Sequence, residues 1–194
     1  LMPIPVVNRM LEHVKQEAAI GGYEAAAMAK DESEDVYRKV GNLLNCDPSE
    51  VALSDNATRS WSMIFYSLKF SRDDVILTSI SEYGSNYIPF LQIAKRTGCK
   101  VIPVPNDNHG QLDVNILKSY VEDVYKDQVK LIAVTHIPTN GGLINPATAI
   151  GAIANTHDIY YLLDACQSVG QVPLDVQEIK CDFLSGTSRK YLRG

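Results

Sequence analysis

Two residues in the C-terminal part of the chain could together carry out carbonyl chemistry. Asp164 closes the apolar run Tyr160–Leu163, and Lys190 follows the next short apolar segment. A carboxylate at the end of one buried strand and an amine after the next suit the binding of a pyridine-ring aldehyde. The amine can condense with the aldehyde, and the carboxylate keeps the ring nitrogen protonated so that the ring can take up electrons. Asp164 and Lys190 are therefore the candidate catalytic residues.

Each of these two residues also has a simpler interpretation. A carboxylate at the end of an apolar strand is costly unless a cation or hydrogen-bond donors accompany it, and Asp164 could instead cap the segment that follows it. Lys190 must lose its proton to form a Schiff base, which predicts a desolvated or cation-crowded setting. The alternative is a solvated basic tail that includes Arg189 and Arg193.

A possible phosphate site lies at the start of an apolar helix. Small and hydroxyl residues, Ala57 and Thr58, begin that helix within the stretch Asp55–Arg59. Backbone N–H groups are free at a helix start, and the helix dipole favours an anion there. The alternative is a simple N-cap formed by Asp55, Asn56 or Thr58.

The surrounding elements alternate between helix and strand. Helical patterns cover Pro5 to Ala18, up to Gly21-Gly22, and then Tyr23–Leu44. The predicted strands are Val51–Ser54, Val75–Ser79, Lys100–Pro105, Val129–Thr135, Tyr160–Asp164 and Asp182–Ser185. The predicted helices between them are Ala57–Phe70, Asn86–Thr97, Val114–Val124 and Pro146–Thr156.

Several of these strands are nearly continuous apolar runs, which is typical of parallel strands covered on both faces. The alternation predicts an α/β fold: a three-layer, doubly wound, mostly parallel sheet. We expect residues 1–45 to form an N-terminal helical segment and residues 46–194 to form the α/β core.

In such sheets, ligands bind outside the carboxyl ends of the strands. Polar residues follow the predicted strands at Ser54–Thr58, Ser81–Ser85, His136–Gly141, Asp164–Gln167 and Gly186–Lys190. The fold class therefore predicts that these five stretches meet in one crevice.

Composition excludes several other classes of function. The chain has 194 residues, enough for one domain with a substantial core, and a net charge of −5 without a basic block, which argues against a nucleic-acid partner. No apolar segment approaches the roughly 18 residues of a membrane span. The four cysteines and four histidines show no metal-ligand spacing. We expect a reduced, cytoplasmic, metal-free protein with no membrane partner.

Two stretches carry a resemblance to a known family. Tyr161–Gly170 (YLLDACQSVG) and Ser185–Gly194 (SGTSRKYLRG) resemble the class V aminotransferases, which include cysteine desulfurases and the isopenicillin-N-epimerase-like and C–S-lyase-like branches. All of these use pyridoxal 5′-phosphate (PLP). A Rossmann dinucleotide binder is the main rival in this fold class, but the chain has no GxGxxG after its first predicted strand.

The resemblance implies roles for residues around the cofactor ring. Gln167 matches a glutamine that hydrogen-bonds the phenolic oxygen, and either Thr139 or Asn140 holds the place of a nearby asparagine. Tyr83 stands where desulfurases place a histidine over the ring. Its aromatic face can stack in the same way, but an ordinary phenol titrates near pH 10 and is a poorer acid or base.

The resemblance also implies residues at the phosphate and at the lysine. Ala57 and Thr58 match an Ala-Thr pair that grips the PLP phosphate, and Arg189 could clamp the phosphate bidentately. The segment that contains Ser188, Arg189 and Lys190 is two residues longer than the Ser-Gly-His-Lys of desulfurases. It looks like the segment of the epimerase-like and C–S-lyase-like branch.

The implied function is a PLP-dependent enzyme that acts on an amino acid through a Lys190 Schiff base. β-Elimination, epimerisation and amino transfer all remain open. The chain begins inside a patterned segment and stops just after Lys190, so we expect it to be the large-domain portion of a homodimeric protein, without the C-terminal small domain. The alternative is an inactive fragment or a degenerate scaffold that serves as a binding module.

Overall fold

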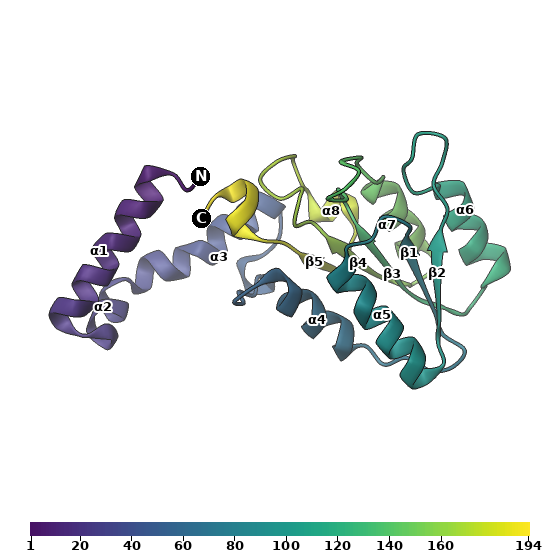
Figure 1. Ribbon diagram of the computed structural model, residues 1–194, viewed down its shortest axis with the longest axis horizontal. Coiled ribbons are helices and arrows are strands. Elements are labelled where there is room, and N and C mark those ends of the chain that lie inside the picture. Colours follow the sequence, from purple (N-terminus) through teal and green to yellow (C-terminus); the bar gives the residue numbers. More distant parts are fainter.

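The computed structural model describes all 194 residues and has a central sheet with helices on both faces (Figure 1). A helical arm precedes the sheet and comprises α1 (Ile4–Ile20), α2 (Gly22–Met28) and α3 (Lys30–Leu44). The strands are β1 (Val75–Ser79), β2 (Lys100–Val104), β3 (Val129–Thr135), β4 (Tyr160–Asp164) and β5 (Phe183–Ser185). The remaining helices are α4 (Ala57–Ser67), α5 (Gly84–Thr97), α6 (Val114–Ser119), α7 (Ala147–Thr156) and α8 (Val176–Ile179).

The sheet has five strands in the order β2-β1-β3-β4-β5, and every neighbouring pair is parallel. This arrangement confirms the predicted doubly wound α/β fold. The chain first winds from β1 to β2, then crosses over β1 to β3 and continues away from it. The winding therefore reverses between β1 and β3, which is the place where this class of sheet opens a crevice for ligands.

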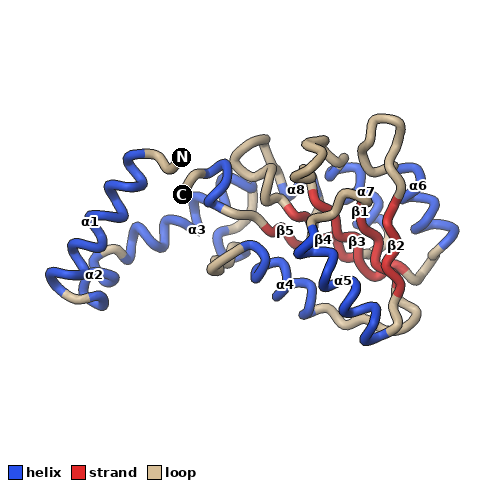
Figure 2. Tube along the Cα trace, viewed as in Figure 1, coloured by secondary structure: helices blue, strands red, loops and turns tan.

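Helices flank the sheet, with α4 and α5 on one face and α6, α7 and α8 on the other (Figure 2), and each face carries a hydrophobic core. On one face, α4 and α5 contribute the aromatic residues Trp61, Phe65 and Phe90, whose rings are in contact. The other core includes α6, α7 and α8. Residues along β3 and β4 alternate between the two cores, so the buried strands are apolar on both faces, as their sequence predicts.

The first helix of the helical arm is largely exposed. None of the α1 residues is buried, and the apolar side chains of Met10, Leu11 and Val14 are exposed. The predicted helical region Tyr23–Leu44 is interrupted at Ala29, where α2 ends and α3 begins. No helix of the structure is both long enough and apolar enough to cross a membrane.

Two local predictions differ from the structure, and two short elements were not predicted. The predicted strand Val51–Ser54 is irregular, because its backbone pairs with no strand and Val51 N–H bonds only back to Pro48. The predicted helix Val114–Val124 is α-helical only to Ser119 and continues as the π-helical turn η2 (Tyr120–Val124). The structure adds α8 and a second π-helical turn, η3 (Ser188–Leu192).

Close packing of α7 against α8 gives the first testable prediction. A Cβ atom on Gly151 would lie 1.7 Å from the carbonyl oxygen of Ile179, whereas a Cβ on Gly22 would have no atom within 4 Å. Gly151→Ala should therefore lower the free energy of unfolding by about 1–3 kcal/mol, and Gly22→Ala should not lower it. Urea unfolding followed by the fluorescence of Trp61, the single tryptophan, measures both. Equal stabilities of the two variants would contradict the packing described here.

Candidate active site

The polar residues that follow the strands surround a small cavity at the carboxyl edge of the sheet. The strand register places Thr135, Asp164 and Ser185 side by side at the ends of β3, β4 and β5. The cavity has a volume of about 90 Å³, and all five polar stretches contribute to its wall. Its lining residues are Asn56, Ala57, Thr58, Tyr83, Ser85, Asn86, Thr135, Thr139, Asp164, Cys166, Gln167, Thr187, Arg189 and Lys190. The predicted crevice is therefore present in the fold.

Most of the residues singled out from the sequence line this cavity, but two do not. Asn140 is exposed in a turn closed by a hydrogen bond from Gly142 N–H to the Pro138 carbonyl. Thr139 lines the cavity instead, and its hydroxyl accepts a hydrogen bond from Gln167 Nε2 at 3.3 Å. Ser188 begins η3 and lines a neighbouring, larger cavity. Of the two alternatives for the asparagine position, only Thr139 therefore lines the cavity, and Ser188 lines the neighbouring one.

Asp164 is buried, with 5% of its surface exposed. Its Oδ1 accepts the backbone N–H of Cys166 at 2.9 Å, and its Oδ2 accepts Nδ2 of Asn86 at 2.7 Å. It forms no ion pair: none of the salt bridges in the structure includes it. The capping role considered from the sequence is present in the Cys166 bond. A carboxylate oxygen pair has about four acceptor positions, so capacity is left for a cationic N–H group.

The start of α4 has free hydrogen-bond donors. Asn56 is its N-cap, and the Asn56 side chain accepts the N–H of Arg59 at 2.9 Å. The backbone N–H groups of Ala57 and Thr58 have no acceptor in the protein. The N-cap and phosphate interpretations are therefore compatible, because the cap satisfies one donor and leaves two of them at the cavity wall.

Two cations come to the same cavity from η3. Lys190 is half-buried and Arg189 precedes it, and both side chains line the cavity. Neither side chain is within salt-bridge distance of a carboxylate.

Sequence reasoning missed a hydrogen-bonded group behind Asp164 that consists of Glu82, Asn86 and Thr135. Asn86 is buried, and its Nδ2 donates to both Glu82 and Asp164. Burial raises the pKa of Glu82, the charge of Asp164 raises it further, and hydrogen bonds from Thr135, Asn86 and Tyr83 oppose the rise. Glu82 lies in the polar stretch after β1 and Asn86 in the first turn of α5, but the sequence gives no signal that either side chain lies beside Asp164.

The donors and acceptors around the cavity fit PLP. Free N–H groups of α4 and the Arg189 guanidinium suit a phosphate, and buried Asp164 suits a protonated ring nitrogen. Lys190 supplies an amine for the aldehyde, and Tyr83 supplies an aromatic face.

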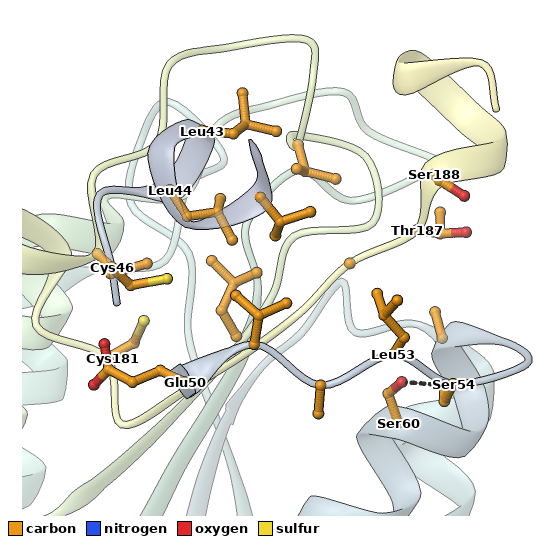
Figure 3. Close-up of a pocket in the computed structure, with 18 of the residues that line it drawn as sticks. Leu43, Leu44, Cys46, Glu50, Leu53, Ser54, Ser60, Cys181, Thr187 and Ser188 are labelled. Atoms are coloured by element: carbon orange, nitrogen blue, oxygen red, sulfur yellow. Dashed lines mark hydrogen bonds between the residues drawn. The ribbon is translucent and has the colours of Figure 1, made fainter. Parts of the chain in front are cut away.

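A larger cavity of about 640 Å³ adjoins the first and shares Asn56, Ala57, Thr187 and Arg189 with it. Figure 3 shows its apolar wall, with Leu43, Leu44 and Leu53, and the irregular segment at residues 51–54 running along it. It lacks Asp164, Lys190 and Gln167. The smaller cavity is therefore the candidate active site, although it is not the largest cavity of the molecule.

Comparison with known proteins shows the family of the chain and agrees with its fold. The family model described as aminotransferase class-V matches residues 1–194. The chain belongs to this family. A probable cysteine desulfurase from Synechocystis sp. is 30% identical over 97% of the chain, and one from Methanothermobacter thermautotrophicus is 29% identical over 97%. The chain spans about half the length of these relatives, 46% in each case.

Solved structures of class V proteins have the same fold. The cystine C–S lyase C-DES, in complex with its product cysteine persulfide, superposes with a TM-score of 0.88 at 20% identity. The match covers 100% of this chain and 52% of the C-DES chain. The apo cysteine desulfurase of Thermococcus onnurineus gives a TM-score of 0.86 at 25% identity, covering 100% of this chain and 48% of its own.

The environment of Cys166 in this class V chain gives a prediction that needs no cofactor. Burial and then the negative charge of Asp164 raise the pKa of the Cys166 thiol to about 12. At pH 8 we expect iodoacetamide to modify Cys166 at least about tenfold more slowly than a small thiol, because the thiolate is the reactive form. Asp164→Asn removes the charge and should speed the modification, as measured by mass spectrometry of the labelled peptide.

Asp182→Asn is the matched control, because Asp182 acts on the pKa of Cys181 rather than that of Cys166. Modification of wild-type Cys166 at the rate of a free thiol would show that the side chain is not buried beside the carboxylate.

Proposed function

We propose that this chain is the cofactor-binding part of a PLP-dependent enzyme that cleaves a carbon–sulfur bond in a cysteine-type amino acid. The observation that carries the proposal is the meeting of Asp164, Lys190 and the free N–H groups of α4 in one cavity. Together they offer one group for each of the three polar features of PLP: its ring nitrogen, its aldehyde and its phosphate.

The cofactor would be held at both ends. Backbone N–H groups of Ala57 and Thr58 would bind the phosphate, with the Arg189 guanidinium as counter-charge. Asp164 would accept the ring N–H with its remaining lone pairs. Gln167, already hydrogen-bonded to Thr139, would reach the phenolic oxygen. Tyr83, on the loop before α5, would cover the ring with its aromatic face.

In the reaction, PLP supplies an electron sink for the pair of electrons released at the substrate α-carbon. Lys190 would hold the cofactor through its amine and would move the substrate α-proton as a general base. Asp164 would keep the ring nitrogen protonated. Tyr83 stands where desulfurases place a histidine over the ring, so histidine-assisted release of the sulfur would not come from this position.

The comparisons favour sulfur chemistry among the reactions that the sequence left open. The desulfurase relatives and the C–S lyase C-DES all break carbon–sulfur bonds of cysteine or cystine. The substrate proposed here is accordingly L-cysteine or L-cystine. The exposed apolar face of α1 also supports a homodimer of the full-length protein, since Met10, Leu11 and Val14 are uncovered in one copy.

Substitution of Lys190 tests the proposal directly. Lys190→Ala in the full-length protein should abolish the visible absorbance of lysine-bound cofactor. It should also lower sulfide or persulfide release from L-cysteine by about a hundredfold or more, because the covalent anchor and the base are lost together. Absorbance spectra and borohydride reduction followed by mass spectrometry measure the attachment.

Lys126→Ala is the control, because Lys126 is exposed in the turn before β3 at the opposite edge of the sheet. A borohydride-stable adduct that persists in Lys190→Ala would remove Lys190 from its role. A wild-type protein that stays colourless with PLP would overturn the enzymatic function itself.

A further inference from the structure

Two carboxyl groups in this molecule share a single amide. Nδ2 of Asn86 donates to Oε1 of Glu82 at 2.9 Å and to Oδ2 of Asp164 at 2.7 Å. Asn86 is 2% exposed, and its bond to Asp164 is buried, whereas its bond to the half-buried Glu82 is partly buried. Both neighbours can accept through these oxygens, and only the NH₂ end of an amide can donate to them. The orientation of the Asn86 side chain is therefore fixed by its surroundings.

Glu82 is itself anchored to the end of β3. Its Oε2 accepts the backbone N–H of Thr135 at 2.9 Å, and its Oε1 accepts the Thr135 hydroxyl. The N–H of Tyr83 donates to Oε1 at 3.0 Å, and the Thr78 hydroxyl lies 3.4 Å from Oε2. These bonds join the loop after β1 to the end of β3, across the point where the winding of the sheet reverses.

No cation or metal site accounts for this arrangement. Neither carboxyl group takes part in a salt bridge, and no cluster of histidine, cysteine and acidic residues could hold a metal ion. Two buried carboxyl groups near one another are unfavourable unless each is well hydrogen-bonded. The pair persists because Asn86 and Thr135 supply donors.

We propose that Glu82 is a positioning residue that acts on Asp164 through Asn86. Glu82 is held by Thr135, it orients the amide of Asn86, and the amide holds Oδ2 of Asp164. The Cys166 N–H fixes Oδ1 at 2.9 Å, so the plane of the Asp164 carboxylate has two fixed points. This inference rests on the proposed function, since the orientation matters only if Asp164 faces the ring nitrogen of PLP.

The state of the ring nitrogen is the readout that separates positioning from mere stability. The full-length protein would be loaded with PLP labelled with ¹⁵N in the ring, and the ¹⁵N chemical shift followed against pH. In wild type we expect the shift of a protonated pyridine. Asn86→Leu, similar in volume but without donors, should lower the pH at which the ring loses its proton by about one unit or more, a tenfold change in that equilibrium.

Combining the variants tests whether Glu82 acts on Asp164 through Asn86. Glu82→Gln should change the ring-nitrogen equilibrium in the same direction as Asn86→Leu but less strongly. The NH₂ group of the glutamine would face hydrogen-bond donors, such as Thr135 and Asn86, that the Glu82 carboxyl group now accepts. If Glu82 acts through Asn86, adding Glu82→Gln to Asn86→Leu should change the equilibrium by less than about twofold further. Asn115→Leu, at an exposed position on α6, is the control and should leave the ring signal unchanged.

The outcomes are distinguishable. If Asn86→Leu binds PLP and keeps the wild-type ring-nitrogen signal, the positioning role alone is overturned. The same holds if the effects of Asn86→Leu and Glu82→Gln on the ring-nitrogen equilibrium are independent, so that the double variant shows the product of the two single effects. If Asn86→Leu does not fold, Glu82→Gln carries the same test with its own ring signal. Wild-type protein that binds no PLP would overturn the proposed function and, with it, this role.

Discussion

The structure depends on keeping the carboxylate of Asp164 buried at the end of β4 without a cation in the protein. Burial of such a group costs several kcal/mol unless its lone pairs are satisfied. Two donors, Cys166 N–H and Asn86 Nδ2, provide partial compensation. The remaining acceptor capacity makes this the most specific feature of the cavity, because it selects a ligand that brings its own positive N–H group.

The sheet topology explains why this arrangement is possible. Reversal of winding between β1 and β3 opens a gap at the carboxyl edge, and the loop after β1 enters it with Glu82 and Asn86. On the other side, η3 brings Arg189 and Lys190 to the same cavity. Cationic groups, helix N–H donors and a buried acid thus line one cavity. A flat, charged, phosphorylated ring matches this distribution.

The sequence predicted the sheet well, because strands such as Val129–Thr135 are apolar on both faces, which is typical of buried parallel strands. It also predicted that Asp164 and Lys190 share a cavity, because the ends of parallel strands share one edge. It failed at Val51–Ser54, where a short, largely apolar run has no strand to pair with. The choice between Thr139 and Asn140 depended on the turn that follows β3. The role of Asn86 depended on contacts between residues 78 positions apart, which no local pattern reveals.

A crystal structure of the full-length protein with PLP tests the central claim most directly. The account predicts one Asp164 oxygen about 3 Å from the ring nitrogen, the other oxygen still bonded to Cys166 N–H, and the Lys190 Nζ joined to the aldehyde carbon. A ring nitrogen that faces a different residue, or a cofactor seated in the larger cavity beside Leu43 and Leu44, would contradict it.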